Sequence, residues 1–266
     1  MADHYNLYPL KHFAATVAQC MDFVLPESYA PAISWVSNIP KDKMGGSADR
    51  AVLYHADAVG QYIWQKYPSL LAPVYRHTTM AVPFLSTVES VTPVAHASMY
   101  TGVDPEVHGI RTYVRPQLTC DTLYDQLIKA GKRVAIVAQE DSTFVHIFKG
   151  RELDMFEMKS SLDTQEKAME LIAMDCYDLI SIHVFNYDSA SHSHGPESKQ
   201  TLNALSFEAE GFARIAETIK ENYKDHRTLL TYSPDHGQHL TEGGNGSHGS
   251  KMIEDMNILH FFGVIN

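Results

Sequence analysis

Aspartate and histidine side chains gather in three short polar segments, each of which follows a run of apolar residues. The candidates are Asp57 in HADAVG (55–60), Asp188 and His192 in NYDSASHSHGP (186–196), and Asp235 with His236 in PDHG (234–237). Carboxylate and imidazole groups without cysteine are ligands that suit Zn²⁺ and neighbouring divalent ions. His248 adds an imidazole on the glycine-rich segment GGNGSHG (243–249), which is flexible enough to fold back toward such a site.

Each of these segments also has an ordinary interpretation when it is taken alone. Asp188 and Asp235 are good turn formers, and His192 and His248 could be solvated loop histidines. Their joint placement favours a role as metal ligands over these separate explanations, because two metal ions a few ångströms apart need about this many ligands.

Thr92 is the candidate nucleophile. It precedes Pro93, and proline is typical of the first position of a helix, so we expect a helix to begin at Pro93. A helix N-terminus favours negative charge, and a metal ion would activate the threonine hydroxyl by lowering its pKa. The alternative is that Thr92 only caps this helix, which is the usual role of an isolated Thr-Pro pair.

The elements that must position these residues alternate along the chain from Ala51 onward. We expect strands at 51–54, 132–138, 178–185, 227–233 and 256–264, and helices at 122–131 and 201–223. Near-continuous apolar strands that alternate with amphipathic helices predict an α/β fold of three layers, with a mostly parallel sheet and helices on both faces. The polar segments then lie beyond the carboxyl ends of strands, where such sheets bind ligands.

Length and composition limit the class of protein. We expect a helical, loop-rich extension at 1–50, packed on an α/β domain at 51–266. A net charge of -11 without a basic block disfavours a nucleic acid polymer as partner. Three scattered cysteines, together with the lack of a signal peptide or an apolar run long enough for a bilayer, predict a cytoplasmic location and no membrane partner.

In their order, these motifs resemble those of the alkaline phosphatase superfamily of two-metal hydrolases, in particular its nucleotide pyrophosphatase/phosphodiesterase branch. The similarity covers residues 51 to 264. HADAVG resembles the first-strand aspartate segment, and TPVAHASMYTGVDPEVHGI (92–110) resembles the nucleophile segment, with Thr92 nine positions before Thr101-Gly102. DSASHSHGP resembles the Asp-x-x-x-His metal motif, and PDHG resembles the family's Asp-His-Gly.

This resemblance implies a hydrolase of phosphoric esters in which Thr92 becomes phosphorylated and water then releases the phosphoryl group. It implies two divalent ions, Zn²⁺ before Mn²⁺. Asp57, Thr92, Asp235 and His236 would surround one ion, and Asp188, His192 and His248 would hold the other. His260 competes with His248 but lies in an expected strand, so His248 is preferred, and His194 has no assigned role.

The phosphodiesterase members place an asparagine after their His-Gly, where this chain has Tyr113. We expect Tyr113 or nearby Arg111 to donate the hydrogen bond to a phosphoryl oxygen instead. There is no room for long insertions around the pocket, which predicts an open site and a small phosphate-ester substrate.

Other activities of the same superfamily stay open: phosphomonoesterase, phosphonate hydrolase or phosphomutase. A sulfatase is disfavoured because the Cys/Ser-x-Pro-x-Arg motif is absent. The alternative from another class is a non-catalytic metal-binding module, and the intact Thr92 argues against it.

Overall fold

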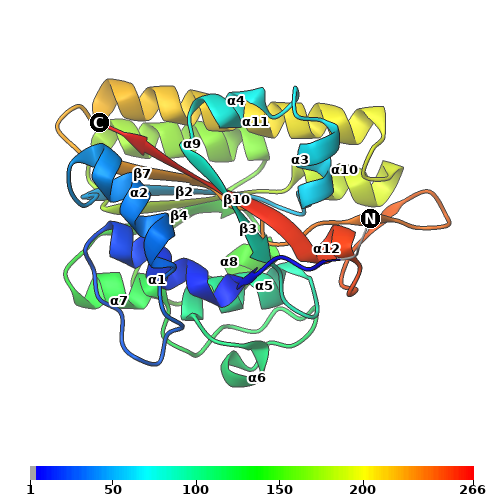
Figure 1. Cartoon of the computed structure of the whole chain (residues 1–266), viewed down its shortest axis with the longest axis horizontal. Helices are drawn as coiled ribbons and strands as arrows, with labels where there is room; N and C mark the ends of the chain where they lie inside the picture. Colours follow the sequence, from blue (N-terminus) through cyan, green and yellow to red (C-terminus); the bar gives the residue numbers. More distant parts are fainter. Residues whose placement is uncertain (1–3) are drawn as a thin grey trace.

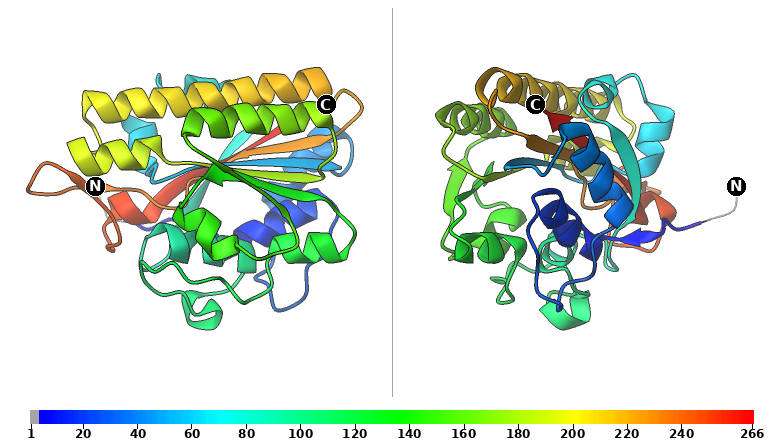
Figure 2. Two further views of the ribbon diagram at one scale, coloured as in Figure 1. Left: turned by 180° about the vertical axis from the view of Figure 1, so that it is seen from behind. Right: turned by 60° about the vertical axis from the view of Figure 1, so that its left-hand side comes forward.

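The computed structural model describes residues 4–266 and has three layers, with one large sheet between two layers of helices (Figure 1). The strand order of the sheet is β1-β3-β10-β7-β2-β6-β4-β5. Figure 2 shows the same layers from behind and from one side. The expected α/β class with a mostly parallel sheet is confirmed.

The eight strands of this sheet are β1 (Tyr8–Pro9), β2 (Arg50–Ala56), β3 (Met80–Leu85), β4 (Val134–Gln139), β5 (Asp154–Met158), β6 (Leu179–Val184), β7 (Thr228–Tyr232) and β10 (Asn257–Ile265). β7, β2, β6, β4 and β5 are neighbours and run parallel. β10 is antiparallel to both of its neighbours, β3 and β7. A separate hairpin of β8 (His239–Leu240) and β9 (Gly246–Ser247) follows β7.

Each face of the sheet has its own hydrophobic core and helices. On one side lie η1 (Leu10–His12), α1 (Phe13–Cys20), α2 (Ser34–Met44), α5 (Thr92–Thr101), α6 (Pro105–His108), α7 (Leu123–Lys129) and α8 (Thr143–Phe148). On the other lie α3 (Gln61–Lys66), α4 (Ala72–Arg76), α9 (Ser161–Met174), α10 (Asn186–His194) and α11 (Lys199–Asn222). The two buried clusters pack against these two sets of helices, and α12 (Ile253–Met256) leads into β10.

The helices expected at 122–131 and 201–223 form for the reasons that the sequence indicates. Thr122 and Asp125 make a capping box at the start of α7. On α11, Phe212 and Ile215 belong to the buried face, and the Ser198 side chain caps the first turn. Both helices therefore combine a local start signal with an apolar stripe.

Residues 4–50 contribute directly to the sheet and its core. β1 pairs in parallel with β3 at the edge of the sheet, and Phe13 and Val17 of α1 are fully buried in one of the two cores. Whether a domain boundary falls at residue 50 stays a prediction. No helix within residues 4–266 combines the length and apolarity that crossing a bilayer requires.

The segment 186–196, whose turn-forming residues favoured a loop, is mostly the helix α10. Its polar composition conceals a helical spacing, since Asp188 and His192 are four residues apart and so lie on one face. Gly195, at a positive φ of 84°, comes directly after the last helical residue.

Candidate active site

A pocket of about 510 Å³ opens at the carboxyl ends of the parallel strands. Asp57 follows β2, Asp188 and His192 follow β6, and the segment from Glu140 to Thr143 follows β4; all of them line it. Because β2, β6 and β4 are adjacent, side chains distant in sequence meet at one edge of the sheet.

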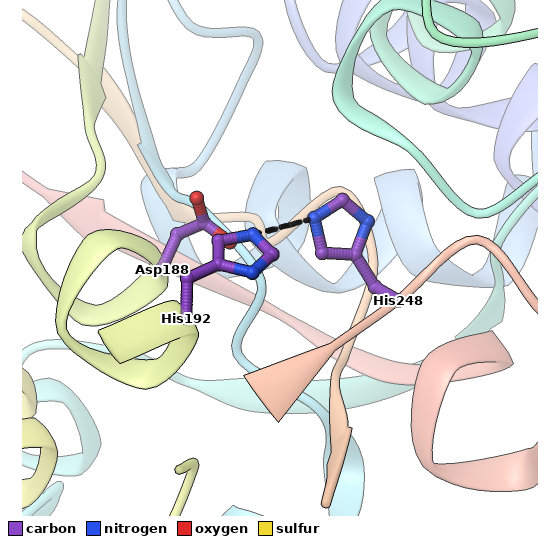
Figure 3. A group of neighbouring side chains, drawn as sticks. All are labelled: Asp188, His192 and His248. Carbon is purple, nitrogen blue, oxygen red and sulfur yellow. Dashed lines mark hydrogen bonds and ion pairs between the residues drawn. The ribbon is translucent and has the colours of Figure 1, made fainter. Parts of the chain in front are cut away.

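Asp188, His192 and His248 form one group that could hold a metal ion (Figure 3). Oδ1 of Asp188 lies 3.3 Å from Nε2 of His192 and 3.7 Å from Nε2 of His248. α10 supplies the first two residues, and the segment after the β8–β9 hairpin brings His248 to them. His248, which we preferred to His260 for this group, therefore lies beside Asp188 and His192.

Asp57, Asp235 and His236 form a second group, whose ligand atoms lie within 4.8 Å of one another. Asp57 comes after β2 and Asp235 and His236 come after the neighbouring β7, and all three are buried. These two are the metal-ligand groups found within residues 4–266.

The imidazoles of both groups each make a hydrogen bond through Nδ1. Nδ1 of His192 donates to the carbonyl of Gly246 (3.1 Å), and Nδ1 of His248 donates to that of Ser90 (3.1 Å). Nδ1 of His236 likewise donates to the carbonyl of Gly237 (3.0 Å). A carbonyl can only accept, so the proton resides on Nδ1 and a neutral ring keeps the Nε2 lone pair for a ligand.

The buried carboxylates also have oxygen atoms to spare. Asp235 accepts hydrogen bonds from the N–H groups of Ala58 and His236 through Oδ1, whereas its Oδ2 has no hydrogen-bond partner among residues 4–266. Oδ1 of Asp57 is equally without one. The donor set therefore fits two divalent cations, since each group combines carboxylate oxygen with imidazole Nε2.

Burial and mutual repulsion govern the protonation of these carboxylates. Burial raises the pKa of Asp235 to about 7, and burial followed by the charge of Asp235 raises the pKa of Asp57 well above its usual range. Burial also acts on Asp188, but the hydrogen bond and charge of His192 outweigh it and lower the pKa. A divalent cation would compensate the negative charge that the structure concentrates here.

Thr92 is the first residue of α5, so this helix begins one residue earlier than expected. The N-cap residue is Val91, and no side chain caps the helix, which contradicts the alternative that Thr92 serves as the cap. Instead, Oγ1 of Thr92 donates to Oδ2 of Asp57 (3.3 Å) and lies 3.4 Å from Nε2 of His236. The hydroxyl is thus directed at the second metal-ligand group.

The remaining expected residues, Tyr113, Arg111 and His260, differ in whether they reach the pocket or a metal-ligand group. Tyr113 lines the pocket, and its hydroxyl lies 3.4 Å from Oγ1 of Thr143. Arg111 does not line it and donates to the carbonyl of Glu106, whereas Arg115 does line it. His260 is buried on β10, donates to the carbonyl of Pro234 and belongs to neither metal-ligand group.

Two buried histidines beside the carboxylates were not expected. Nε2 of His183 lies 3.3 Å from Oδ2 of Asp57, and Nε2 of His96 lies 3.5 Å from Oδ2 of Asp235. Burial lowers the pKa of His183 to about 3, and burial first, then the neighbouring imidazoles, lowers that of His96 well below its ordinary value. The available signal was a histidine inside the apolar strand 178–185 and another one helical turn after Thr92.

The sequence model of the type I phosphodiesterase / nucleotide pyrophosphatase family matches residues 61–261. The chain belongs to this family. The match includes Thr92 and every expected metal ligand except Asp57, which lies just before it. The resemblance seen in the motifs is therefore confirmed.

The curated relatives share only a short segment with this member of the phosphodiesterase family. It is 34% identical over 68 residues to GPI ethanolamine phosphate transferase 1 of Neurospora crassa, and to the same protein of Chaetomium globosum. The Neurospora match covers 26% of this chain and 6% of the relative. The chain thus spans a small part of the length of these relatives.

Solved structures show the same fold over most of the chain. The C-terminal periplasmic domain of phosphoethanolamine transferase EptC from Campylobacter jejuni has a TM-score of 0.59 at 15% identity, covering 82% of this chain and 80% of that one. Murine ectonucleotide pyrophosphatase / phosphodiesterase 5 has a TM-score of 0.58 at 15% identity, covering 73% and 59%. The domain of EptC from Escherichia coli in complex with Zn has a TM-score of 0.58 at 12% identity, covering 83% and 74%.

Proposed function

We propose that this phosphodiesterase-family protein is a metal-dependent hydrolase of small phosphodiesters, with Thr92 as its nucleophile. The observation that supports this most strongly is the position of the Thr92 hydroxyl. It is not used as a helix cap, and it donates to Asp57 of one metal-ligand group in the pocket that the other group also lines. We propose two divalent ions, Zn²⁺ before Mn²⁺, with the ligands assigned above.

Bound ions would supply positive charge that lowers the pKa of the Thr92 hydroxyl and offsets charge on the phosphoryl oxygens. Oγ of Thr92 attacks phosphorus, forming one P–O bond while the P–O bond to the leaving alcohol breaks. The hydroxyl proton passes to Oδ2 of Asp57, the atom that accepts its hydrogen bond, and the departing alkoxide takes a proton from solvent. The N-terminus of α5 adds partial positive charge beside the new phospho-threonine.

Water then attacks the phospho-threonine, releases the phosphate monoester and restores the Thr92 hydroxyl. Tyr113 lines the pocket, which supports its role as the donor of a hydrogen bond to the substrate. For Arg111, our other candidate for this role, the structure offers no contact with the pocket, and Arg115 is a better placed cation. A pocket of about 510 Å³ suits a small ester.

A transferase is the second candidate, because the relatives include proteins named ethanolamine phosphate transferases. The chemistry would differ only in the second step, where an alcohol rather than water attacks the phospho-threonine. The EptC domain from Campylobacter jejuni, of which 80% is covered, is the specific observation in favour of this reading.

The deciding experiment compares hydrolysis of bis-p-nitrophenyl phosphate with that of p-nitrophenyl phosphate by zinc-loaded protein, with and without an added alcohol. Preference for the diester, with products of water attack, supports the proposal. Phosphorylated alcohol as the main product supports the transferase, and preference for the monoester supports a phosphatase. No turnover of either ester by protein that holds two ions would favour the non-catalytic metal-binding module.

We also propose that the protein is cytoplasmic. Cys20, Cys120 and Cys176 are all free thiols, which suits a reducing compartment. Fractionation of cells that express the protein tests this, and recovery in a membrane or secreted fraction contradicts it.

A further inference from the structure

The helix that carries Asp188 and His192 begins without a local cap. The N-cap position of α10 is Phe185, and no side-chain cap hydrogen bond is made there. The first N–H groups of a helix have no acceptor within the helix, so other groups must supply one. Asp, Asn, Ser and Thr are preferred at the N-cap because their side chains can do so, and phenylalanine cannot.

Glu208 of α11 supplies the missing acceptor. Its Oε1 accepts a hydrogen bond from the N–H of Tyr187 at 3.1 Å, and the N–H of Asn186 also stabilises this carboxyl group. Its backbone carbonyl accepts from the hydroxyl of Tyr54 on β2 (3.0 Å). The cap for α10 thus comes from the neighbouring helix, 21 residues further along the chain.

Apart from these N–H groups and the Tyr54 hydroxyl, the residues around Glu208 are largely apolar. It lies on the face of α11 that carries Leu205, Ala209 and Phe212, all of which pack in the hydrophobic core, and it is itself fully buried. Burial raises the pKa of Glu208 to about 8, which reflects the cost of placing an ionisable group here. Such a cost calls for a role that an apolar side chain could not fill.

We infer that Glu208 is a positioning residue for the group of Asp188, His192 and His248, and that it acts through the first turn of α10. Asp188 directly follows Tyr187, so the hydrogen bond from Tyr187 to Glu208 fixes the backbone that carries the Asp188 carboxylate. His192 lies one turn later on the same face and only 3.1 Å from His248 between the two Nε2 atoms. Displacement of the first turn would therefore separate Asp188 from its two imidazoles.

This inference rests on the proposed function, because it assigns a residue to one of the two proposed ion sites. Glu208 belongs to neither metal-ligand group and does not line the pocket. We expect substitution of Glu208 to affect only the ion held by the Asp188 group, since Asp57, Asp235 and His236 are carried by other elements.

The test compares Glu208→Met with Glu208→Gln. Methionine keeps the approximate length of the side chain and suits the apolar surroundings, but it accepts no comparable hydrogen bond. Glutamine keeps a carbonyl oxygen that can accept from the same N–H groups. The matched control is Glu210→Met, an exposed position on the same helix.

Each substitution is introduced into His236→Ala, which leaves the Asp188 group intact, and into His192→Ala, which leaves the Asp57 group intact. Zinc affinity is measured by competition with a chromophoric chelator, alongside thermal unfolding. We expect Glu208→Met to weaken zinc binding by about 10-fold in the His236→Ala background, the scale typical of residues that orient metal ligands. We expect no change in the His192→Ala background, and Glu208→Gln and Glu210→Met should preserve both affinities.

Equal weakening at both sites by Glu208→Met, or no weakening, would overturn the inference while leaving the proposed function intact. A 10-fold loss in Glu208→Gln would overturn it as well, and this result does not depend on the methionine variant folding. If the unsubstituted protein binds no zinc, the proposed function and the inference both fail.

Discussion

His192 and His248 bring their Nε2 atoms to within 3.1 Å of each other, although 56 residues separate them along the chain. Both rings donate through Nδ1 to backbone carbonyls, so two lone pairs would face each other if both rings were neutral. A shared cation or proton relieves this repulsion. The hydrogen bond to Asp188 raises the pKa of His192, while burial lowers that of His248 to about 4.

We therefore expect His192→Ala or His248→Ala to remove one of two bound ions, because each takes one of three ligands from the same group. Metal content of the purified, metal-replete variants checks this. His194→Ala is the matched control, since His194 lies on the same helix but outside both groups, and it should retain two ions. A second ion that persists in both His192→Ala and His248→Ala would contradict the assignment.

Thr92→Ala should lower kcat for a phosphodiester by ~10³-fold or more, an order of magnitude typical of losing a nucleophile. The metal content should stay the same, since three other ligands surround that ion. Thr92→Ser keeps a hydroxyl at this position and should retain measurable activity. Unchanged turnover in Thr92→Ala would exclude the proposed mechanism.

Tyr113→Phe and Arg111→Ala should differ in their effects on kcat/KM. Tyr113 lines the pocket and Arg111 does not, so loss of the Tyr113 hydroxyl should reduce kcat/KM by about 10-fold, the scale of one hydrogen bond to a charged group. Arg111→Ala should change it by less than about twofold, as its contact is with a backbone carbonyl on the surface. A larger loss in Arg111→Ala than in Tyr113→Phe would restore Arg111 as the substrate contact.

The stability of the metal-free protein should depend on pH through Glu208. The folded pKa of about 8 lies above the ordinary value of 4.5, so the native state holds a proton that the unfolded chain releases between these values. The free energy of unfolding therefore falls as pH rises through this window. Glu208→Gln does not take up or release this proton. Its free energy of unfolding relative to that of the unsubstituted protein should therefore increase from pH 5 to pH 8 by about a few kcal/mol, the scale expected when burial raises a pKa from 4.5 to about 8.

Urea denaturation in the presence of a chelator at pH 5, 6.5 and 8 measures that difference. Asp57 and Asp235 are present in both proteins, so their titration contributes to both curves and largely cancels in the comparison. A difference that does not change with pH would show that Glu208 titrates near its ordinary pKa.

The sequence alone was sufficient to predict the strands that carry the site and the polar segments that follow them. β2, β6 and β7 read as apolar runs because both of their faces are buried, and Asp57, Asp188 and Asp235 come just after them. β3 was missed, since Pro83 makes its sequence look unlike a strand. The assignment of individual ligands stays a prediction until metal is measured.

The contacts between elements could not be predicted from local patterns. Glu208 reads as an ordinary polar residue of a long helix, and only the packing of α11 on α10 shows that it caps its neighbour. His183 and His96 likewise have significance only because the fold places them beside Asp57 and Asp235. The antiparallel orientation of β10 is a property of the whole sheet, which no single stretch of sequence encodes.

β10 lies between β3 and β7 and is hydrogen-bonded to both. It therefore joins the part of the sheet that leads into Thr92 to the part that leads into Asp57, Asp188 and Asp235. During synthesis on the ribosome, the sheet hydrogen bonds that join these two parts cannot form until residues 257–265 have emerged. The sheet is then completed only after the nucleophile segment and all of the expected metal ligands have been translated, so a nascent chain lacking this strand should leave these two parts of the sheet unpaired with each other.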